Sequence, residues 1–299
     1  MMAGGSARRP RVLIVGAGDV GSRVIDQLDG RAIVVAMVRR RGARAQLHRP
    51  GVASLVADLD RRASLQLLHA LDFDAVIHLA PPQSDGRHDL RTRALVDALT
   101  MRPRPGLRFV YVSTSGVYGD QGGAQVDEDT PARPRNARAR RRIDAERTLA
   151  SAARRNHWHL SVLRAPGIYA ADRLPIERLR AGTPAIHSHE DSWSNHIHAD
   201  DLAGLCIAAL RSHRALRIYN ASDDRPLPMG DWFDKVADRF ALPRPPRVSR
   251  EDARRSVSAS LWSFMAESRR LSNRRASREL RYRLRWPDVD TFLASLPPP

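Results

Sequence analysis

Three glycines near the start of the chain have a spacing that suits phosphate binding. Gly16, Gly18 and Gly21 directly follow the apolar run 11–15 and lead into a segment with a helical pattern. In this arrangement the first glycine allows a tight turn, the second lets backbone N–H groups approach a pyrophosphate, and the third lets the helix pack on the strand. An ordinary glycine turn is the alternative, but the position between strand and helix predicts a dinucleotide site. Asp19 suits the positive end of the helix dipole, although its carboxylate must point away from the phosphates.

Cations follow the second apolar run, 32–38, where an NAD-binding chain usually has Asp or Glu to accept from the ribose 2′-hydroxyl. This chain has Arg39, Arg40 and Arg41 there. Guanidinium groups match a 2′-phosphate and offer no acceptor for a hydroxyl. The sequence therefore predicts NADP in preference to NAD, with NAD as the alternative because arginine is common throughout the chain. Asp58, after the third run, is expected either to accept from the adenine amino group or to be a plain turn acid.

The elements that must position these groups are short, apolar and rich in β-branched residues. Longer amphipathic stretches separate them, which is typical of βαβ crossovers and of a parallel sheet covered on both faces. We therefore predict an α/β fold with a doubly wound parallel sheet, the Rossmann arrangement. The expected strands are RVLIV (11–15), AIVVAMV (32–38), ASLVA (53–57), DAVIHLA (74–80), LRFVYVS (107–113), HLSVLR (159–164) and RIYN (217–220).

The chain has a strong positive charge, and almost all of its basic residues are arginine. The formal net charge is +17 over 299 residues, and Lys235 is the only lysine, so arginine supplies the other 49 of the 50 basic residues. Clustered cations favour nucleic acid, but these arginines are spread along the whole chain, and a coding bias explains them equally well. We expect a small-molecule partner and no nucleic acid, with nucleic-acid binding kept as an alternative.

Other classes of protein fit the sequence less well. The single cysteine, Cys206, excludes an internal disulfide and a cysteine-based zinc cage, and it lies in an apolar run typical of a core. Histidines at 187, 189, 196 and 198 complete no metal-ligand spacing, so we predict no metal. The apolar run near the N-terminus is too short for a signal peptide or a membrane span, which predicts a cytoplasmic protein without a membrane partner.

These motifs together resemble the extended short-chain dehydrogenases/reductases, which are the NAD-dependent epimerase/dehydratase family, and within them the atypical members. The similarity runs nearly end to end, in the order and spacing of the family. The segments that carry it are GAGDVG (16–21), ADL (57–59), VIHLAPP (76–82), VSTSGVYG (112–119), DEDTPARP (127–134), LRAPGIYA (163–170), NHIHADDLAG (195–204), YNASDD (219–224) and SRRLSNRRASREL (268–280).

The resemblance implies a catalytic hydroxyl at the end of the fifth strand. The family has Ser or Thr four residues before the Tyr of a VYG motif, and here that residue is Thr114, with Ser115 beside it. Their hydroxyls would donate to a substrate carbonyl or a developing alkoxide. The alternative is a turn hydroxyl that satisfies the local backbone.

The family's proton donor is missing from the expected helix. The family has a Tyr four residues before a Lys, and counting back from Glu146 places Arg138 and Arg142 at those positions. No tyrosine lies between 119 and 168, so an error of register cannot restore the pair. A guanidinium stays charged at any working pH and cannot shuttle a proton. Arg142 is expected to hydrogen-bond the nicotinamide ribose, and Arg138 to clamp an anionic substrate.

Three consequences of this loss stay open. In the first case, the phenol of Tyr118 or Tyr169, or a positioned water molecule, serves as the general acid. Alternatively, Thr114 polarises the carbonyl and solvent supplies the proton, which gives slow hydride transfer. In the third case no reaction occurs, and the protein is a sensor or scaffold that binds NADP.

After about Tyr169 the apolar runs become shorter and prolines more frequent, which indicates a second lobe, and the resemblance implies which further residues bind ligands. We expect a dinucleotide-binding domain over 8–170 and a smaller substrate lobe over 171–299, with the strand at 217–220 returning to the main sheet. The protein is expected to be an oxidoreductase or epimerase-like enzyme acting on a small polar substrate, and a homodimer is left open. The cofactor-binding residues are expected to be Gly16, Gly18, Asp19, Val20, Gly21, Arg39, Arg40, Asp58, Leu59, Leu79, Ala80, Pro81, Thr114, Arg142, Pro166 and Ile168, and the substrate-binding residues Tyr169, Trp193 and Asn195.

Overall fold

The computed structural model describes residues 8–40, 42 and 50–297. Arg41, one of the predicted cofactor ligands, lies outside the described residues. The chain divides into two compact units that are interleaved in sequence. Unit 1 comprises residues 1–113, 141–163 and 203–218, and unit 2 comprises residues 114–140, 164–202 and 219–299.

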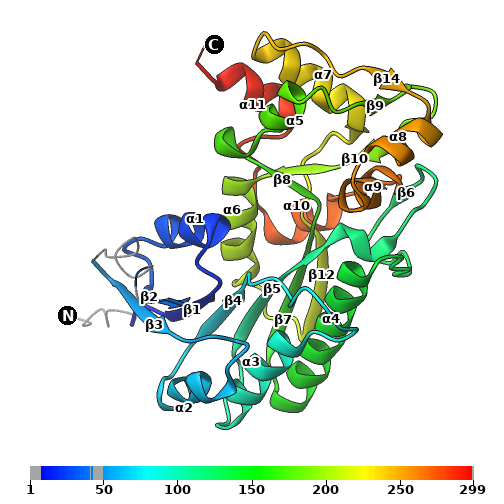
Figure 1. Ribbon diagram of the computed structural model, residues 1–299. Helices are drawn as coiled ribbons and strands as arrows, with labels where there is room; N and C mark the ends of the chain where they lie inside the picture. Colours follow the sequence, from blue (N-terminus) through cyan, green and yellow to red (C-terminus); the bar gives the residue numbers. More distant parts are fainter. Residues whose placement is uncertain (1–7, 41, 43–49, 298–299) are drawn as a thin grey trace. The chain divides into compact units, whose positions relative to one another are not determined.

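A seven-stranded sheet is the framework of unit 1 (Figure 1). Its strand order is β12-β7-β5-β4-β1-β2-β3, and β1 pairs in parallel with both β2 and β4. The chain thus winds outward from β1 in two directions, which confirms the predicted doubly wound sheet. The strands are β1 (Arg11–Val15), β2 (Ile33–Val38), β3 (Val52–Val56), β4 (Ala75–His78), β5 (Arg108–Thr114), β7 (His159–Ala165) and β12 (Leu216–Asn220).

Helices cover both faces of this sheet, as its nearly continuous apolar strands require. The helices α2, α3 and α4 pack on one face, and α1 and α6 lie on the other (Figure 1). A short 3-10 turn, η2, precedes α2. The bounds are α1 (Asp19–Gln27), η2 (Arg62–Gln66), α2 (Leu67–Ala70), α3 (Leu90–Thr100), α4 (Ala137–Asn156) and α6 (Ala199–Ala209).

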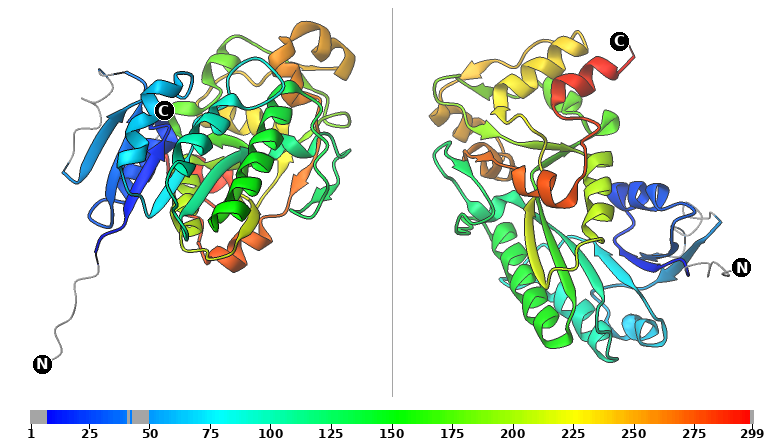
Figure 2. Two further views of the ribbon diagram at one scale, coloured as in Figure 1. Left: turned by 90° about the horizontal axis from the view of Figure 1, so that it is seen from below. Right: turned by 180° about the vertical axis from the view of Figure 1, so that it is seen from behind.

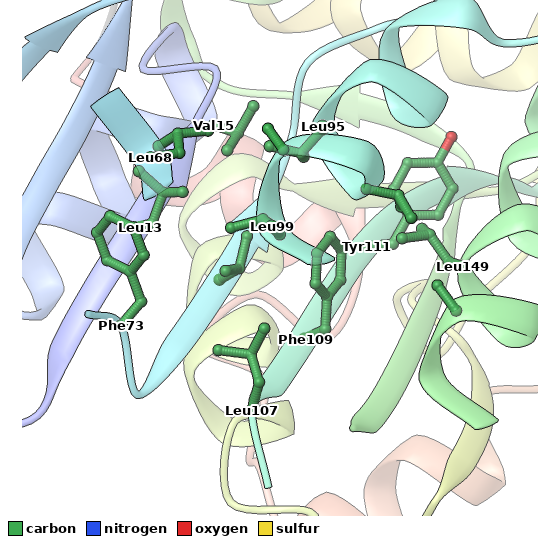
Figure 3. Close-up of a cluster of buried hydrophobic side chains, with 14 of the residues drawn as sticks. Leu13, Val15, Leu68, Phe73, Leu95, Leu99, Leu107, Phe109, Tyr111 and Leu149 are labelled. Atoms are coloured by element: carbon green, nitrogen blue, oxygen red, sulfur yellow. The ribbon is translucent and has the colours of Figure 1, made fainter. Parts of the chain in front are cut away.

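The core under α2, α3 and α4 contains only every second side chain of β1. Leu13 and Val15 of β1 belong to this cluster, whereas Val12 and Ile14 are equally buried but lie outside it. Successive residues of a strand point to opposite faces, so β1 contributes to two cores. In Figure 3 the side chains of β1, β5, α2, α3 and α4 meet in one apolar layer, with Phe109 near its centre.

Unit 2 consists of short strands and helices around a second apolar cluster. Its core joins Tyr169, Trp232, Phe233 and Phe292, and α7 packs beside α11 (Figure 2). The elements are η3 (Ser115–Tyr118), β6 (Gln125–Val126), β8 (Gly167–Tyr169), η4 (Ala171–Arg173), α5 (Ile176–Arg180), β9 (Ala185–Ile186), β10 (Trp193–Ser194), β11 (His196–His198), β13 (Leu227–Pro228), α7 (Met229–Arg239), β14 (Arg247–Val248), α8 (Arg250–Ser256), α9 (Ala259–Met265), β15 (Arg270–Leu271), α10 (Arg274–Leu280) and α11 (Val289–Ser295).

The strand pairs of unit 2 join segments that are far apart in sequence. Strand β8 pairs with β11, β9 with β14 and β6 with β15, all in parallel, while β10 and β13 are antiparallel. Each pair is only two or three residues long, so these strands depend on the surrounding side-chain packing.

Truncation of Phe109 is expected to destabilise unit 1. Its ring is fully buried and stacks on Trp158, with the ring centroids 5.8 Å apart. Phe109→Ala would leave a cavity and should lower the free energy of unfolding by about 3–5 kcal/mol, measured by urea unfolding. Leu67→Ala is the control, because Leu67 is 56% exposed and its loss should cost under about 0.5 kcal/mol. Equal effects of the two substitutions would contradict this account of the core.

Candidate active site

The glycine turn lies at the point where the strand order reverses. Gly16 follows β1 and adopts φ +99°, a conformation that L side chains rarely adopt. A Cβ atom at Gly16 would lie 2.7 Å from the backbone nitrogen of Ala80. The N–H groups of Leu79 and Ala80 in turn donate to the carbonyl oxygen of Val15, at 2.8 and 3.0 Å. The turns after β1 and β4 are therefore in backbone contact, and only glycine fits the first of them.

The other two glycines have different surroundings. A Cβ atom at Gly21 would collide with the carbonyl oxygen of Gly16, so Gly21 permits the close approach of α1 to the turn. A Cβ atom at Gly18 would meet nothing within 4 Å, so Gly18 leaves open space at the start of α1. Val20 follows in the first turn of the helix. Unpaired N–H groups and the helix dipole make such an open helix start suitable for a pyrophosphate.

The carboxylate of Asp19 is occupied by a neighbour on the same helix. Arg23 lies one turn further along α1, and its Nε donates to Asp19 Oδ1 at 2.8 Å. The ion pair offsets a negative charge that would otherwise oppose a phosphate at this helix start.

The residues expected to recognise the adenosine end lie after β2 and β3. Arg39 and Arg40 are exposed, and the charge of Arg39 helps to lower the pKa of the Asp60 carboxyl, after the stronger effect of its hydrogen bond with Arg91. Asp58 Oδ1 accepts from the N–H of Asp60 at 3.0 Å, and the N–H of Asp58 donates to Ser64. Leu59, between these two aspartates, is buried.

Arg91 is a residue of this region that the sequence reasoning missed. It lies in α3, and its guanidinium binds both carboxylate oxygens of Asp60, at 2.7 and 2.6 Å. Its NH1 also donates to the carbonyl oxygens of Pro81 and Pro82, at 3.1 and 3.3 Å. A planar guanidinium can make such a set of bonds at once. Arg91 therefore ties the loop after β3 to the loop after β4, which places Pro81.

Arg142 lies in α4 beside the end of β5. Its NH1 donates to the carbonyl oxygen of Val112 at 2.8 Å and to the phenol oxygen of Tyr111 at 3.1 Å. On the same helix, Glu146 accepts a hydrogen bond from Ser113 at 2.5 Å. Arg142 is thus a cation of α4 that is bonded to the backbone of β5.

A buried polar chain was also missed by the sequence reasoning. His78 ends β4, is fully buried, and lies 3.0 Å from Thr92 Oγ1, which donates to Asp89 Oδ2 at 2.7 Å. Because the hydroxyl proton goes to Asp89, Nε2 of His78 must donate to Thr92. Burial, and next the charge of Arg142, lower the pKa of His78 to about 3, so the imidazole is neutral at pH 7.

In unit 2 the segment after β5 holds the predicted hydroxyls. Thr114 Oγ1 accepts from the N–H of Gly116 at 3.2 Å, and Ser115 is 4% exposed. Tyr118, three residues after Ser115, is fully buried, and its phenol donates to Asn220 Oδ1 at 2.7 Å. The guanidinium of Arg164 lies over its ring, 4.8 Å from the centroid. Tyr118 is therefore enclosed in the interior of unit 2.

A cavity of about 310 Å³ in unit 2 brings many of the predicted residues together. Thr114 lines it from the end of β5, Arg138 from the start of α4, and Tyr169 from β8. Tyr118 does not line it. The other predicted residues in its wall are Ser115, Pro166, Ile168, Trp193 and Asn195.

Two of these residues shape the wall in different ways. Asn195 donates to the carbonyl oxygen of Arg269 at 2.9 Å and accepts from the N–H of Leu271 at 2.7 Å, so it anchors the strand β15 beside the cavity. Tyr169 is 2% exposed and packs against the rings of Trp232 and Phe292. Burial raises the pKa of the Tyr169 phenol, which makes it a weaker acid than a tyrosine in water.

The cavity also contains residues that the sequence did not single out. Three further arginines line it, Arg173, Arg178 and Arg269, together with Glu267 and His196. They come from segments separated by up to a hundred residues, and single arginines in so arginine-rich a chain carry no signal of their own. Burial lowers the pKa of His196 to about 4, and its Nε2 lies 3.2 Å from Ser194 Oγ.

The low pKa values of two buried histidines predict that the folded protein loses stability in acid. An unfolded histidine has a pKa near 6.5, whereas His78 and His196 have values of about 3 and 4. Between pH 6.5 and 4 the unfolded chain binds more protons than the folded one, so stability falls as the pH falls. Each group contributes at most about 1.4 kcal/mol per pH unit.

His78→Gln keeps a donor for Thr92 and removes the titration. The loss of unfolding free energy between pH 6.5 and 4.5, measured by urea unfolding, should be smaller in this variant than in the wild type. An unchanged pH dependence would show that folding does not shift the pKa of His78.

None of the helices in the described residues is long and apolar enough to cross a membrane.

A comparison with curated proteins found no match. Solved structures do match, and three illustrate the range. A functionally unknown conserved protein from Silicibacter pomeroyi is 27% identical, with a TM-score of 0.79 and coverage of 95% of this chain and 96% of the other.

A putative NAD-dependent epimerase/dehydratase from Methylobacillus flagellatus is 26% identical, with a TM-score of 0.73 and coverage of 97% and 98%. A third structure is the UDP-glucuronic acid 4-epimerase of Bacillus cereus, solved with UDP-glucuronic acid and NAD. It is 19% identical, with a TM-score of 0.74 and coverage of 95% of this chain and 97% of the other. At this identity the likeness concerns the fold alone. The model of the NAD dependent epimerase/dehydratase family matches residues 12–222, a span that includes the glycine turn, all seven strands of the main sheet and Thr114. The chain therefore belongs to the NAD-dependent epimerase/dehydratase family, as its motifs indicated.

Proposed function

We propose that the protein is an NAD(P)-dependent oxidoreductase that acts on a small polar substrate and prefers NADP. The observation that carries this proposal is the glycine turn. Gly16 fits against Ala80 with no room for a side chain, while the start of α1 at Gly18 is open, which is the form a pyrophosphate requires. Membership of the family supports the use of a nicotinamide dinucleotide.

The residues of unit 1 would hold the cofactor along its whole length. The turn at Gly16, Gly18 and Gly21 would bind the pyrophosphate, and Arg39 and Arg40 the 2′-phosphate. Arg142 uses its NH1 for Val112 and Tyr111, but a guanidinium has five N–H donors, and three remain for the nicotinamide ribose. The bound nicotinamide would supply or accept a hydride.

Thr114 is the hydroxyl that we assign to the substrate carbonyl. It lines the cavity of unit 2, and its Oγ1 is held by the N–H of Gly116. A hydrogen bond from this hydroxyl would stabilise negative charge on the substrate oxygen. Tyr118 donates to Asn220 in the interior, and burial weakens Tyr169 as an acid. We therefore propose that solvent, rather than a phenol, delivers the proton.

One set of observations favours a second function, that of an NADP-binding sensor or scaffold without turnover. Arginines stand at both positions where the family has its proton donor and lysine, and a guanidinium cannot shuttle a proton. In this case the dinucleotide would bind but no substrate would react.

Loss of both exposed cations after β2 is expected to change cofactor preference. The double variant Arg39→Gln/Arg40→Gln removes charged donors worth about 1.5–3 kcal/mol each to a bound phosphate. The dissociation constant of NADPH, measured by fluorescence titration, should rise at least about tenfold. That of NADH should change less than about threefold, since NADH has no 2′-phosphate.

Two further variants make this titration decisive. Arg31→Gln removes an exposed arginine just before β2 and should leave both constants unchanged. Gly18→Ala should weaken both dinucleotides without lowering the melting temperature, because its methyl group enters open space in the free protein. Failure of the wild type to bind either dinucleotide would refute the proposal and the sensor alternative together.

The role of Thr114 is tested separately by turnover. Thr114→Ala should lower kcat about 100-fold or more, the effect of removing one donor to a developing oxyanion. Thr114→Ser retains the hydroxyl and should keep most of the activity. An unchanged kcat in Thr114→Ala would remove Thr114 from the mechanism, and NADPH binding without turnover on any carbonyl substrate would favour the sensor.

A further inference from the structure

Aromatic rings from separate segments line the cavity of unit 2. Those of Tyr169, Trp232 and Phe233 belong to buried residues. Trp193 and Phe264 also line it and are partly open to solvent. The rings of Tyr169 and Trp232 contact each other, with their centroids 5.8 Å apart. A ligand in the cavity therefore meets ring surfaces contributed by β8, β10, α7 and α9.

Three of the cations in the cavity wall are already screened or paired. Arg138 and Arg173 are exposed, so water screens their charges, and each also interacts with another group of the chain. Arg269 NH1 lies 2.9 Å from Glu267 Oε2 and donates to the carbonyl oxygen of Gly119 at 2.7 Å. A ligand therefore does not have to bring a negative charge to balance these arginines.

The fourth cation, Arg178, uses its guanidinium for the wall itself. Its NH2 donates to the carbonyl oxygen of Pro184 at 3.1 Å, and the guanidinium lies over the ring of Phe233, 3.9 Å from the centroid. Its Nε is buried and closed to solvent. Stacking on a ring fixes the plane of a guanidinium and covers one of its faces. Arg178 thus supports the aromatic wall.

The neutral polar groups of the wall also have partners, but the proton of the Thr114 hydroxyl is available. Asn195 uses both ends of its amide on the backbone of neighbouring segments. Ser194 Oγ lies 3.2 Å from His196 Nε2. Thr114 Oγ1 accepts from the N–H of Gly116 at 3.2 Å, and a hydroxyl that accepts one hydrogen bond still has its own proton to donate. Thr114 therefore offers a donor in a wall that is otherwise rich in aromatic rings.

The size of the cavity favours a compact ligand. At about 310 Å³ it lies near the lower end of the range for ligand sites, which is about 300–1,000 Å³. We propose that this cavity binds an uncharged aromatic ketone or aldehyde, whose carbonyl oxygen accepts from Thr114 and whose ring packs on the aromatic wall.

The inference narrows the small polar substrate of the proposed function to a carbonyl compound without a charged group. It differs from the expectation from the sequence that Arg138 clamps an anionic substrate. The assignment of this ligand as the substrate rests on the proposed function, but its binding does not.

The experiment is a ligand-observed NMR titration of the whole chain without cofactor. Acetophenone is compared with benzoate, which keeps the aromatic ring and carries a charge, and with cyclohexyl methyl ketone, which keeps the carbonyl and lacks the aromatic ring. Acetophenone should bind at least about tenfold more tightly than benzoate, because a carboxylate would lose its hydration beside the rings. It should bind at least about threefold more tightly than cyclohexyl methyl ketone, because an aromatic ring packs favourably on other aromatic rings.

Variants identify the contacts. Thr114→Ala should weaken acetophenone about threefold or more, because it removes the donor to the carbonyl oxygen, and Thr114→Ser should restore the binding. Phe264→Leu keeps an apolar side chain at a position that is 49% exposed, and it should weaken acetophenone about twofold more than cyclohexyl methyl ketone. Ser260→Ala is the matched control, since Ser260 is exposed, lies one turn earlier in α9 and does not line the cavity; it should bind all three ligands like the wild type.

Several outcomes overturn the inference. Benzoate bound as tightly as acetophenone would show that the cavity does not select a neutral ligand, and equal binding of the two ketones would remove the aromatic ring from the proposal. UDP-glucose that binds more tightly than acetophenone and displaces it would replace the class of ligand. NADPH titrated on the same sample separates the two proposals. Binding of NADPH without acetophenone contradicts this inference alone, and binding of acetophenone without NADPH contradicts only the proposed function.

Discussion

The backbone contact between Gly16 and Ala80 is the constraint on which the dinucleotide site depends. It joins the turns after β1 and β4, the two neighbouring strands from which the sheet is wound in opposite directions. Two N–H groups donate to the carbonyl oxygen of Val15 at the same place. Parallel strands end at one edge of a sheet, and a ligand can enter where successive crossovers diverge. The glycine is what lets the two turns approach while the start of α1 stays open.

Arginine has several distinct functions in this chain, and they explain how so large a positive charge is accommodated. Arg91 binds Asp60 through two oxygens and also two carbonyl groups, thereby joining two loops of unit 1. Arg142 is bonded to the backbone of β5. Arg138 and Arg178 stack on phenyl rings. A lysine has no planar fork and could not make the paired or stacked contacts, so the near absence of lysine has structural consequences.

Arginine also bears on the chemistry that we propose for this chain. In the proposed function, Arg138 and Arg142 of the helix α4 stand at the positions where the resemblance implies an acid and a lysine. The tyrosines nearest in sequence do not compensate, because Tyr118 is bonded inside unit 2 and burial raises the pKa of Tyr169. The hydroxyl of Thr114 in the cavity wall is therefore the group on which the proposed reaction is built.

The sequence by itself determined the fold class, the glycine turn and the family, because these depend on local spacing. Alternating apolar runs require a sheet covered on both faces, and GxGxxG after the first run marks the turn. Thr114 and Asn195 were singled out through their motifs, and both line the cavity of unit 2. Only the tertiary structure showed that Arg178, Arg269 and Glu267 share one cavity, and that His78 lies in a buried chain with Thr92 and Asp89. Burial and contact between distant segments decide those properties, and neither has a local pattern in the sequence.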